Sequence, residues 1–133
     1  MDRQFDRFEY RFTYGLGFPN SFFGGIILKI DVEKKAVAGT WEDSTCLATE
    51  PIFIPSPQSN QDSTEEDGVL MFVCHKTGQN TQQTSLVVLS SQLKELGRFS
   101  APVATTIGIH GIWLPNANQV TTDFPLAINE TLR

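Results

Sequence analysis

Short segments rich in β-branched and aromatic residues recur along this chain, and no stretch of about ten residues or more has the periodicity of an amphipathic helix. One of these segments, Gly68–Cys74, is apolar at nearly every position, which is typical of a central strand covered on both faces. The other candidate strands are separated by turns or polar loops and cover residues 11–15, 24–32, 36–41, 47–54, 84–90, 96–101 and 107–114. Seven or eight short strands at these spacings predict an all-β fold: a sandwich, a barrel or a propeller. The one local alternative is a short helix over residues 92–99.

The composition fits a single folded domain. The chain has 133 residues, of which 40% are hydrophobic, enough to fill a core. Residues 1–9 mix charged and aromatic side chains without a regular spacing and are expected to form a poorly ordered lead-in, whereas residues 116–133 form a tail without a clear pattern. The body of the domain is therefore expected at residues 10–115, with residues 55–67 as a solvated loop inside it.

Charge and hydropathy exclude several kinds of partner. The net charge is −5 and no cluster of Lys and Arg is present, which argues against nucleic acid and against an anionic membrane surface. The apolar runs of 6 to 8 residues are too short for a transmembrane segment. The N-terminal residues carry charge and lack an apolar core, so they do not form a secretory signal. We expect a cytoplasmic protein, or a mitochondrial one if a transit segment precedes this sequence.

The two cysteines, Cys46 and Cys74, do not have the spacing of a zinc site, and one pair does not make a disulfide framework. Neither has a neighbouring base in sequence that would activate it as a nucleophile. We expect both to be free, buried thiols of a protein in a reducing compartment.

The stretch Ile107–Trp113 places His110 between Gly108 and Gly111 in an apolar run that is typical of a buried strand. An unpaired buried polar group costs roughly 1–3 kcal/mol, so a buried imidazole here needs a hydrogen-bond partner or a metal. The two glycines leave room for a close approach to the backbone. Without further information, a histidine of this kind is more often a satisfied core residue than a metal ligand.

Glu50 is the second candidate, because it lies in another apolar run, residues 47–55. The simpler reading is an acid at a strand edge that faces water. His75 follows a strand and precedes a polar turn, so we expect it to be exposed. The acidic residues 65–67 resemble a paired-carboxylate site but are better explained as a surface turn before Gly68.

Six blocks of this sequence resemble the C-terminal part of a carotenoid cleavage oxygenase, in the family's order and at similar spacing. These blocks are Trp41, Thr49–Pro55, Glu65–Leu70, Leu86–Leu89, Leu93–Arg98 and His110–Trp113. Upstream, residues 10–15 and 28–32 are similar as well. Any single block is a weak signal, but six in order are specific. The animal branch, which includes the β-carotene oxygenases and the isomerase of the retinal pigment epithelium, looks closest.

The resemblance implies a seven-bladed β-propeller with an Fe(II) ion on its axis, held by four histidines from different blades. By motif, His110 matches the last iron ligand, and Glu50 matches a glutamate that hydrogen-bonds a ligand histidine and orients it. Neutral imidazole suits Fe(II), and a carboxylate on the far ring nitrogen fixes the tautomer of such a ligand. The implied reaction is cleavage of a C=C bond of a carotenoid or apocarotenoid by dioxygen, giving two carbonyl products.

The chain departs from the family pattern in one large respect. It has only two histidines, and His75 does not match a ligand motif. We therefore expect residues 10–115 to be the C-terminal propeller segment of such an oxygenase, about one blade plus neighbouring strands, in a chain that is a fragment and inactive alone. Any peripheral contact with a membrane would involve parts absent here.

Two alternatives remain at this stage. One is a retinoid isomerase of the same family. The other is a non-enzymatic all-β module that binds another protein through its open strand edges, or binds an apolar ligand inside a small barrel.

Overall fold

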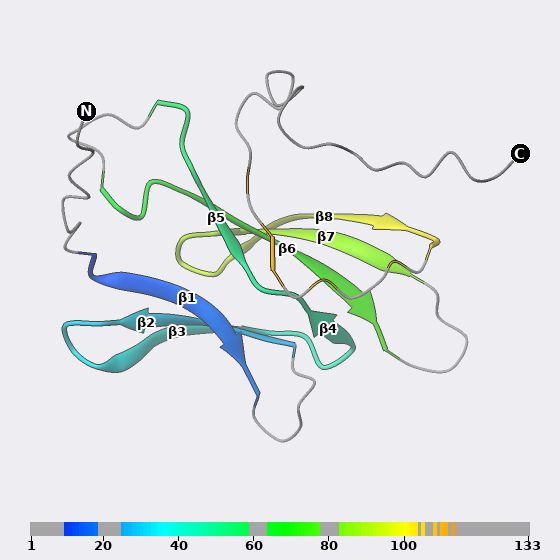
Figure 1. Cartoon of the computed structure of the whole chain (residues 1–133), viewed down its shortest axis with the longest axis horizontal. Helices are drawn as coiled ribbons and strands as arrows, with labels where there is room; N and C mark the ends of the chain where they lie inside the picture. Colours follow the sequence, from blue (N-terminus) through cyan, green and yellow to red (C-terminus); the bar gives the residue numbers. More distant parts are fainter. Residues whose placement is uncertain are drawn as a thin grey trace, which may run out of the picture.

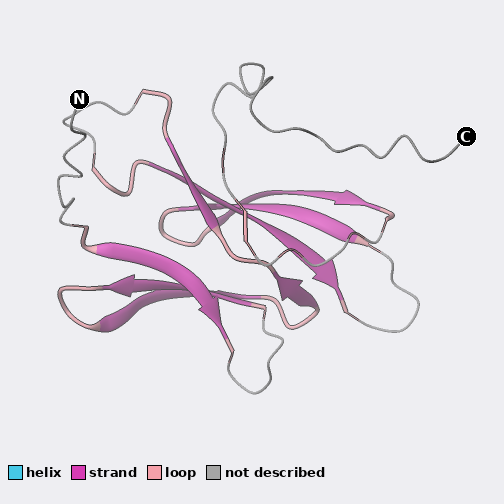
Figure 2. Cartoon of the chain, in the orientation of Figure 1, coloured by secondary structure: helices cyan, strands magenta, loops and turns pink. Residues whose placement is uncertain are grey.

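The computed structural model describes residues 10–18, 25–58, 64–77 and 83–103, together with Thr105, Gly108, His110, Gly111 and Trp113. These residues form an all-β structure, as the sequence predicted, in which every paired strand is antiparallel to its neighbour (Figures 1 and 2). The expected lead-in and tail, residues 1–9 and 116–133, lie outside the described residues. The strands are β1 (Phe12–Gly17), β2 (Ile26–Asp31), β3 (Ala36–Glu42), β4 (Cys46–Ala48), β5 (Ile52–Pro55), β6 (Gly68–Lys76), β7 (Thr84–Ser90) and β8 (Glu95–Ala101).

The strands belong to two sheets. A three-stranded sheet has the order β1-β2-β3, and a five-stranded sheet has the order β4-β6-β7-β8, with β5 paired to β6 beside β4. The β2–β3 connection is the tight turn predicted from the charged residues 33–35. The alternative of a helix over residues 92–99 is wrong, because a turn and then β8 occupy this stretch. None of the described residues form a helix long and apolar enough to cross a membrane.

The core lies between the two sheets. Ile27 of β2 is fully buried against residues of β6 and β7. Two ring contacts join the sheets, since Trp41 meets Phe72 edge-on at 5.0 Å and Tyr14 stacks parallel to Phe53 at 6.0 Å. The buried apolar residues are Ile27, Cys46, Ala48, Leu70, Phe72, Cys74, Val87, Leu89 and Leu93.

The interface becomes polar toward one end of β2, where Lys29 and Asp31 are buried on the same face as Ile27. The ammonium group of Lys29 pairs with Glu66 and lies 4.2 Å from the ring centre of Phe12. Asp31 accepts two hydrogen bonds from the Arg11 guanidinium, at 3.2 and 3.0 Å.

The neighbouring Glu65 carboxylate accepts hydrogen bonds from the backbone N–H groups of Arg11 and Phe12, at 2.9–3.0 Å. The acidic turn at residues 65–67 is therefore a turn, as predicted, but it also ties β1 and β2 to the start of β6. We call this set, Arg11, Lys29, Asp31, Glu65 and Glu66, the ionic clamp.

One expected strand is in fact two. Residues 47–54 were predicted as a single run, but β4 ends at Ala48 and β5 begins at Ile52, and both pair with β6. Pro51 has no N–H group and cannot continue the ladder. Glu50 therefore lies in a seam between two strands, not within one.

The central strand β6 is covered differently from the prediction. Its residues alternate between fully and partly buried, with Leu70, Phe72 and Cys74 facing the three-stranded sheet. Met71 and Val73 point to the other face, which the described residues cover only in part. A run apolar at nearly every position thus has one closed face and one face that is still accessible.

The cysteines also differ from the prediction. Cys46 of β4 and Cys74 of β6 are buried as expected, but they are joined in a disulfide, with 5.4 Å between their Cα atoms. Ala48 pairs with Cys74, so Cys46 lies diagonally across from Cys74 on the same face of the sheet. The prediction of free thiols was wrong because strand register, not sequence spacing, brings the two residues together.

Candidate functional site

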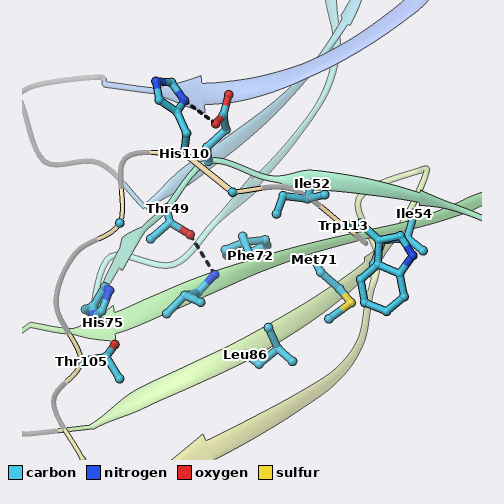
Figure 3. Close-up of a pocket in the computed structure, with 14 residues that line it drawn as sticks. Thr49, Ile52, Ile54, Met71, Phe72, His75, Leu86, Thr105, His110 and Trp113 are labelled. Carbon is cyan, nitrogen blue, oxygen red and sulfur yellow. Dashed lines mark hydrogen bonds and ion pairs between the residues drawn. The ribbon is translucent and has the colours of Figure 1, made fainter. Parts of the chain in front are cut away.

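The two residues singled out by sequence, Glu50 and His110, lie side by side although they are 60 positions apart. The Nδ1 atom of His110 is 2.8 Å from Oε2 of Glu50 (Figure 3). A carboxylate accepts, so Nδ1 is the donor in this pair, and Nε2 takes no part in it. A neutral imidazole held in this way presents Nε2 as an acceptor or a metal ligand.

Thr49 fixes the position of Glu50. The backbone N–H of Thr49 donates to the carbonyl oxygen of Val73 at 2.9 Å, and the Thr49 hydroxyl oxygen accepts from the Val73 N–H at 3.0 Å. These two bonds replace the ladder where Pro51 interrupts it. Glu50 is thereby anchored to the central strand while its own backbone lies outside both β4 and β5.

His110 approaches from a separate segment that passes over β5. A Cβ atom at Gly111 would come within 2.8 Å of Ile52 Cδ1, so glycine allows this close approach, whereas the position of Gly108 is open. The sequence predicted close approach at both glycines, and the structure confirms it for Gly111.

The environment of His110 differs from the prediction of a buried strand. Gly108, His110, Gly111 and Trp113 are exposed and belong to no strand, and the other residues of 107–114 lie outside the described residues. The His110 side chain is 81% exposed and that of Glu50 is 46% exposed. The hydrogen bond to Glu50, not burial, therefore holds the ring.

A cavity of about 280 Å³ lies beside the pair, on the accessible face of the five-stranded sheet. Its wall is mainly aliphatic and aromatic, with side chains from β5, β6 and β7 and from the segment that carries His110 (Figure 3). The lining residues are Thr49, Glu50, Ile52, Ile54, Met71, Phe72, Val73, His75, Leu86, Thr105, Gly108, His110, Gly111 and Trp113.

His75 lines the same cavity, which corrects the prediction that it is exposed. It occupies β6 opposite Leu47 of β4 and is only partly accessible. Its Nε2 atom is buried and has no hydrogen-bond partner among the described residues. Solvent therefore does not reach this ring nitrogen.

The described residues do not make a complete metal site. No group of three or more His, Cys, Asp or Glu side chains among them could hold an ion. What they supply is one imidazole oriented by one carboxylate. This pair has the chemistry of one ligand with its supporting partner, and further donors would have to come from elsewhere.

Sequence reasoning missed two elements of the site. The first is Thr49, whose signal was its place directly before Glu50 and Pro51, where a hydroxyl group can replace a lost backbone partner. The second is the cavity with Trp113 in its wall, which depends on the path of the His110 segment over the sheet. No local sequence pattern indicates that path.

Comparisons with known proteins agree with the resemblance in the sequence. The family described as retinal pigment epithelial membrane protein matches residues 1–115. The chain is 34% identical over 112 residues to a mitochondrial carotenoid-cleaving dioxygenase of Pongo abelii, covering 84% of this chain and 19% of the relative. It is 33% identical over 117 residues to a carotenoid isomerooxygenase of Galleria mellonella, covering 84% and 22%.

A third relative, a beta,beta-carotene 15,15'-dioxygenase of Gallus gallus, is 31% identical over 108 residues, which cover 80% of this chain and 20% of that protein. The chain thus spans about a fifth of the length of the curated relatives it matches. The match to the family extends over most of the chain and includes both Glu50 and His110. The chain belongs to the retinal pigment epithelial membrane protein family, the family of the carotenoid cleavage oxygenases.

Proposed function

We propose that this chain is part of a longer iron(II)-dependent oxygenase that cleaves a C=C bond of a carotenoid or apocarotenoid with dioxygen to give carbonyl products. The observation that carries the proposal is the 2.8 Å contact between His110 Nδ1 and Glu50 Oε2. The relatives that share this part of the sequence are named for carotenoid cleavage or isomerooxygenation.

His110 and Glu50 have separate roles in this proposal. His110 would bind the iron through Nε2, the ring nitrogen that Glu50 leaves free. Glu50 would act as a positioning residue, because it fixes the ring plane and raises the basicity of the imidazole. The bound iron would supply activation of dioxygen. The apolar cavity beside the pair would hold part of a hydrocarbon substrate away from water.

The remaining ligands would come from the rest of the longer protein. The edge strand β8, on which Leu96 and Phe99 are exposed, fits a structure that continues into further strands. Stacked antiparallel sheets of this size are the repeating unit of a propeller. We therefore place the described strands in a seven-bladed propeller whose other blades are not in this sequence.

The test uses the longer protein expressed with residues 1–133 as one segment. His110→Ala is expected to abolish both bound iron and apocarotenoid products, because one ligand is lost. Glu50→Gln keeps the shape but removes the charge, so iron affinity is expected to fall about 10–100-fold. His75→Ala is the matched control, since its Nε2 is inaccessible, and it is expected to keep normal iron content.

Each result has a counterpart that would overturn part of the proposal. Normal iron in His110→Ala rules out its role as a ligand. If the longer protein keeps a full complement of iron and isomerises its substrate without cleaving it, the result favours the retinoid isomerase of the same family. Product analysis by mass decides between these two activities, since cleavage with dioxygen adds oxygen atoms and isomerisation does not.

A second candidate, an all-β interaction module without catalysis, rests on the exposed edge strand β8. Leu96 and Phe99 on this strand are 58% and 69% exposed. An unpaired edge of this kind favours pairing with another chain. Iron and product analysis of the longer protein separates the two, because stoichiometric iron together with a cleaved product is incompatible with a purely structural module.

A further inference from the structure

Two cavities lie next to each other on the five-stranded sheet, and among the described residues they share Ile54 and Trp113. The first is the cavity of about 280 Å³ beside Glu50 and His110. The second, of about 710 Å³, is formed by the end of β5, the start of β6 and the loop between them. Its lining residues are Ile54, Pro55, Ser56, Pro57, Asp67, Gly68, Val69 and Trp113.

Trp113 forms the part of the wall between these cavities that does not belong to the sheet. Ile54 belongs to β5 and is paired with Val69, so its backbone is fixed in the sheet. Trp113 belongs to no strand, and it is 49% exposed. Figure 3 shows its indole beside Ile54 and Met71, on the far side of the cavity from His75. A large aromatic side chain that closes one end of an apolar cavity limits what that cavity can hold.

We propose that Trp113 is a specificity-determining residue that sets the length of the apolar molecule bound beside His110. This inference rests on the proposed function, to which it adds a limit on substrate length. The occupant is an elongated molecule with a hydrocarbon body, because Ile52, Ile54, Met71, Val73 and Leu86 line the first cavity. Two of the polar side chains in the wall of this cavity, Glu50 and His110, are already bonded to each other.

The volumes give the expected size limit. A water-sized group, similar in size to a methylene, takes up roughly 30 Å³, so the first cavity holds on the order of ten such groups. Removal of the indole would join this space to the second cavity. The joined space would accept a chain several methylenes longer, without any change in the Glu50–His110 pair.

The experiment measures binding of straight-chain 1-alcohols from octanol to tetradecanol to the 133-residue chain, by displacement of the fluorescent probe N-phenyl-1-naphthylamine. In the wild type, Kd is expected to fall about fourfold per methylene up to about decanol and then to stay constant. In Trp113→Ala the fall is expected to continue to tetradecanol, a gain of about tenfold or more over the wild type even if the added methylenes are only partly buried. Trp113→Phe keeps an aromatic wall and is expected to keep the limit close to that of the wild type.

The variants contain their own control of folding. The chain has two tryptophans, so Trp113→Ala leaves Trp41, which packs against Phe72 in the core, as the only source of indole fluorescence. The emission maximum of Trp41 in this variant should stay at the wavelength of a tryptophan that packs against Phe72, which shows that the chain is folded.

Three outcomes would overturn the proposal. They are an unchanged length limit in Trp113→Ala, no displacement by any alcohol, and burial of Trp113 in a dimer of this chain that excludes the alcohols. Binding of alcohols needs no metal. A failed alcohol-binding experiment therefore does not decide whether His110 is a ligand, which the iron analysis above tests. Loss of iron binding likewise does not affect the predicted limit on ligand length.

Discussion

The hydroxyl group of Tyr14 in β1 donates a hydrogen bond to the carbonyl oxygen of Ser91, 3.0 Å away in the turn after β7. One phenol therefore joins the three-stranded sheet to the five-stranded sheet, while its ring stacks on Phe53 of β5. Burial, and secondarily the negative charges of Glu66 and Glu65, raise the pKa of Tyr14 to about 12.

This pKa predicts an alkaline loss of stability. The folded chain favours the neutral phenol, so the contribution of Tyr14 is complete below the pKa of an unfolded tyrosine, near 10, and disappears as the pH rises through about 12. The free energy of unfolding should fall over this interval more steeply in the wild type than in Tyr14→Phe. At pH 7, Tyr14→Phe is expected to cost about 0.5–1.5 kcal/mol for the lost hydrogen bond. Urea denaturation at several pH values measures both, and identical pH profiles for the two proteins would contradict the assignment.

Lys29 and Glu66 of the ionic clamp are expected to respond unequally to mutation. The Lys29 side chain is 8% exposed and that of Glu66 is 29% exposed. Glu66→Gln leaves a buried ammonium without its counter-ion and is expected to cost about 3–5 kcal/mol. Lys29→Met leaves a carboxylate that water can still reach, so its cost is expected to be smaller.

The double variant Lys29→Met, Glu66→Gln should recover most of the loss of the single Glu66→Gln change, because no unpaired charge remains. A double-mutant cycle by chemical denaturation provides the measurement. Strictly additive effects would show that the two groups do not interact.

A second polar network predicts a loss of stability in acid. Hydrogen bonds from Arg98 are the main reason that the pKa of Glu95 lies below its usual value. A lowered pKa means that the stabilisation is present above the unfolded pKa and is lost as the pH falls below it. Arg98→Met keeps an apolar stem near Trp41 but removes the donors, so it should cost about 0.5–1 kcal/mol at pH 7 and less at pH 3. A cost that stays the same at both pH values would assign the effect to packing on Trp41.

The disulfide predicts that thiol titration of the purified, denatured chain without reductant finds no reactive cysteine. Cys46 and Cys74 are separated by 28 positions, and closing a loop of this length stabilises a fold by roughly 3–4 kcal/mol. Reduction should therefore lower the midpoint of denaturation, and Cys46→Ser with Cys74→Ser should lower it to the same extent in the absence of reductant. Two titratable thiols in the non-reduced chain would restore the prediction made from the sequence.

The strands could be predicted because their signal is local. β-Branched residues in β2, β6 and β7, separated by polar turns, are enough to place them. The errors arose where the outcome depends on pairing between distant segments. Pro51 splits one expected strand because it has no backbone N–H to donate to β6, and Cys46 meets Cys74 through register. The ionic clamp joins Lys29 to Glu66 across 37 positions, which no local pattern indicates.

The candidate site was predictable in its residues but not in its surroundings. Glu50 and His110 were conspicuous because each is polar within an apolar run, and the structure brings the two together. The expectation of burial failed because it assumed a strand around His110, whereas Gly108, His110, Gly111 and Trp113 are exposed and belong to no strand. The position of Trp113 between two cavities depends on the fold alone.

The seam between β4 and β5 has a consequence for how this site can change in evolution. Thr49 and Val73 carry the hydrogen bonds at the seam, so the backbone of Glu50 makes no contribution to the ladder on either side. Substitutions of Glu50 can therefore alter the chemistry offered to His110 without disturbing the sheet. Loss or exchange of this carboxylate in evolution is therefore expected to leave a folded protein.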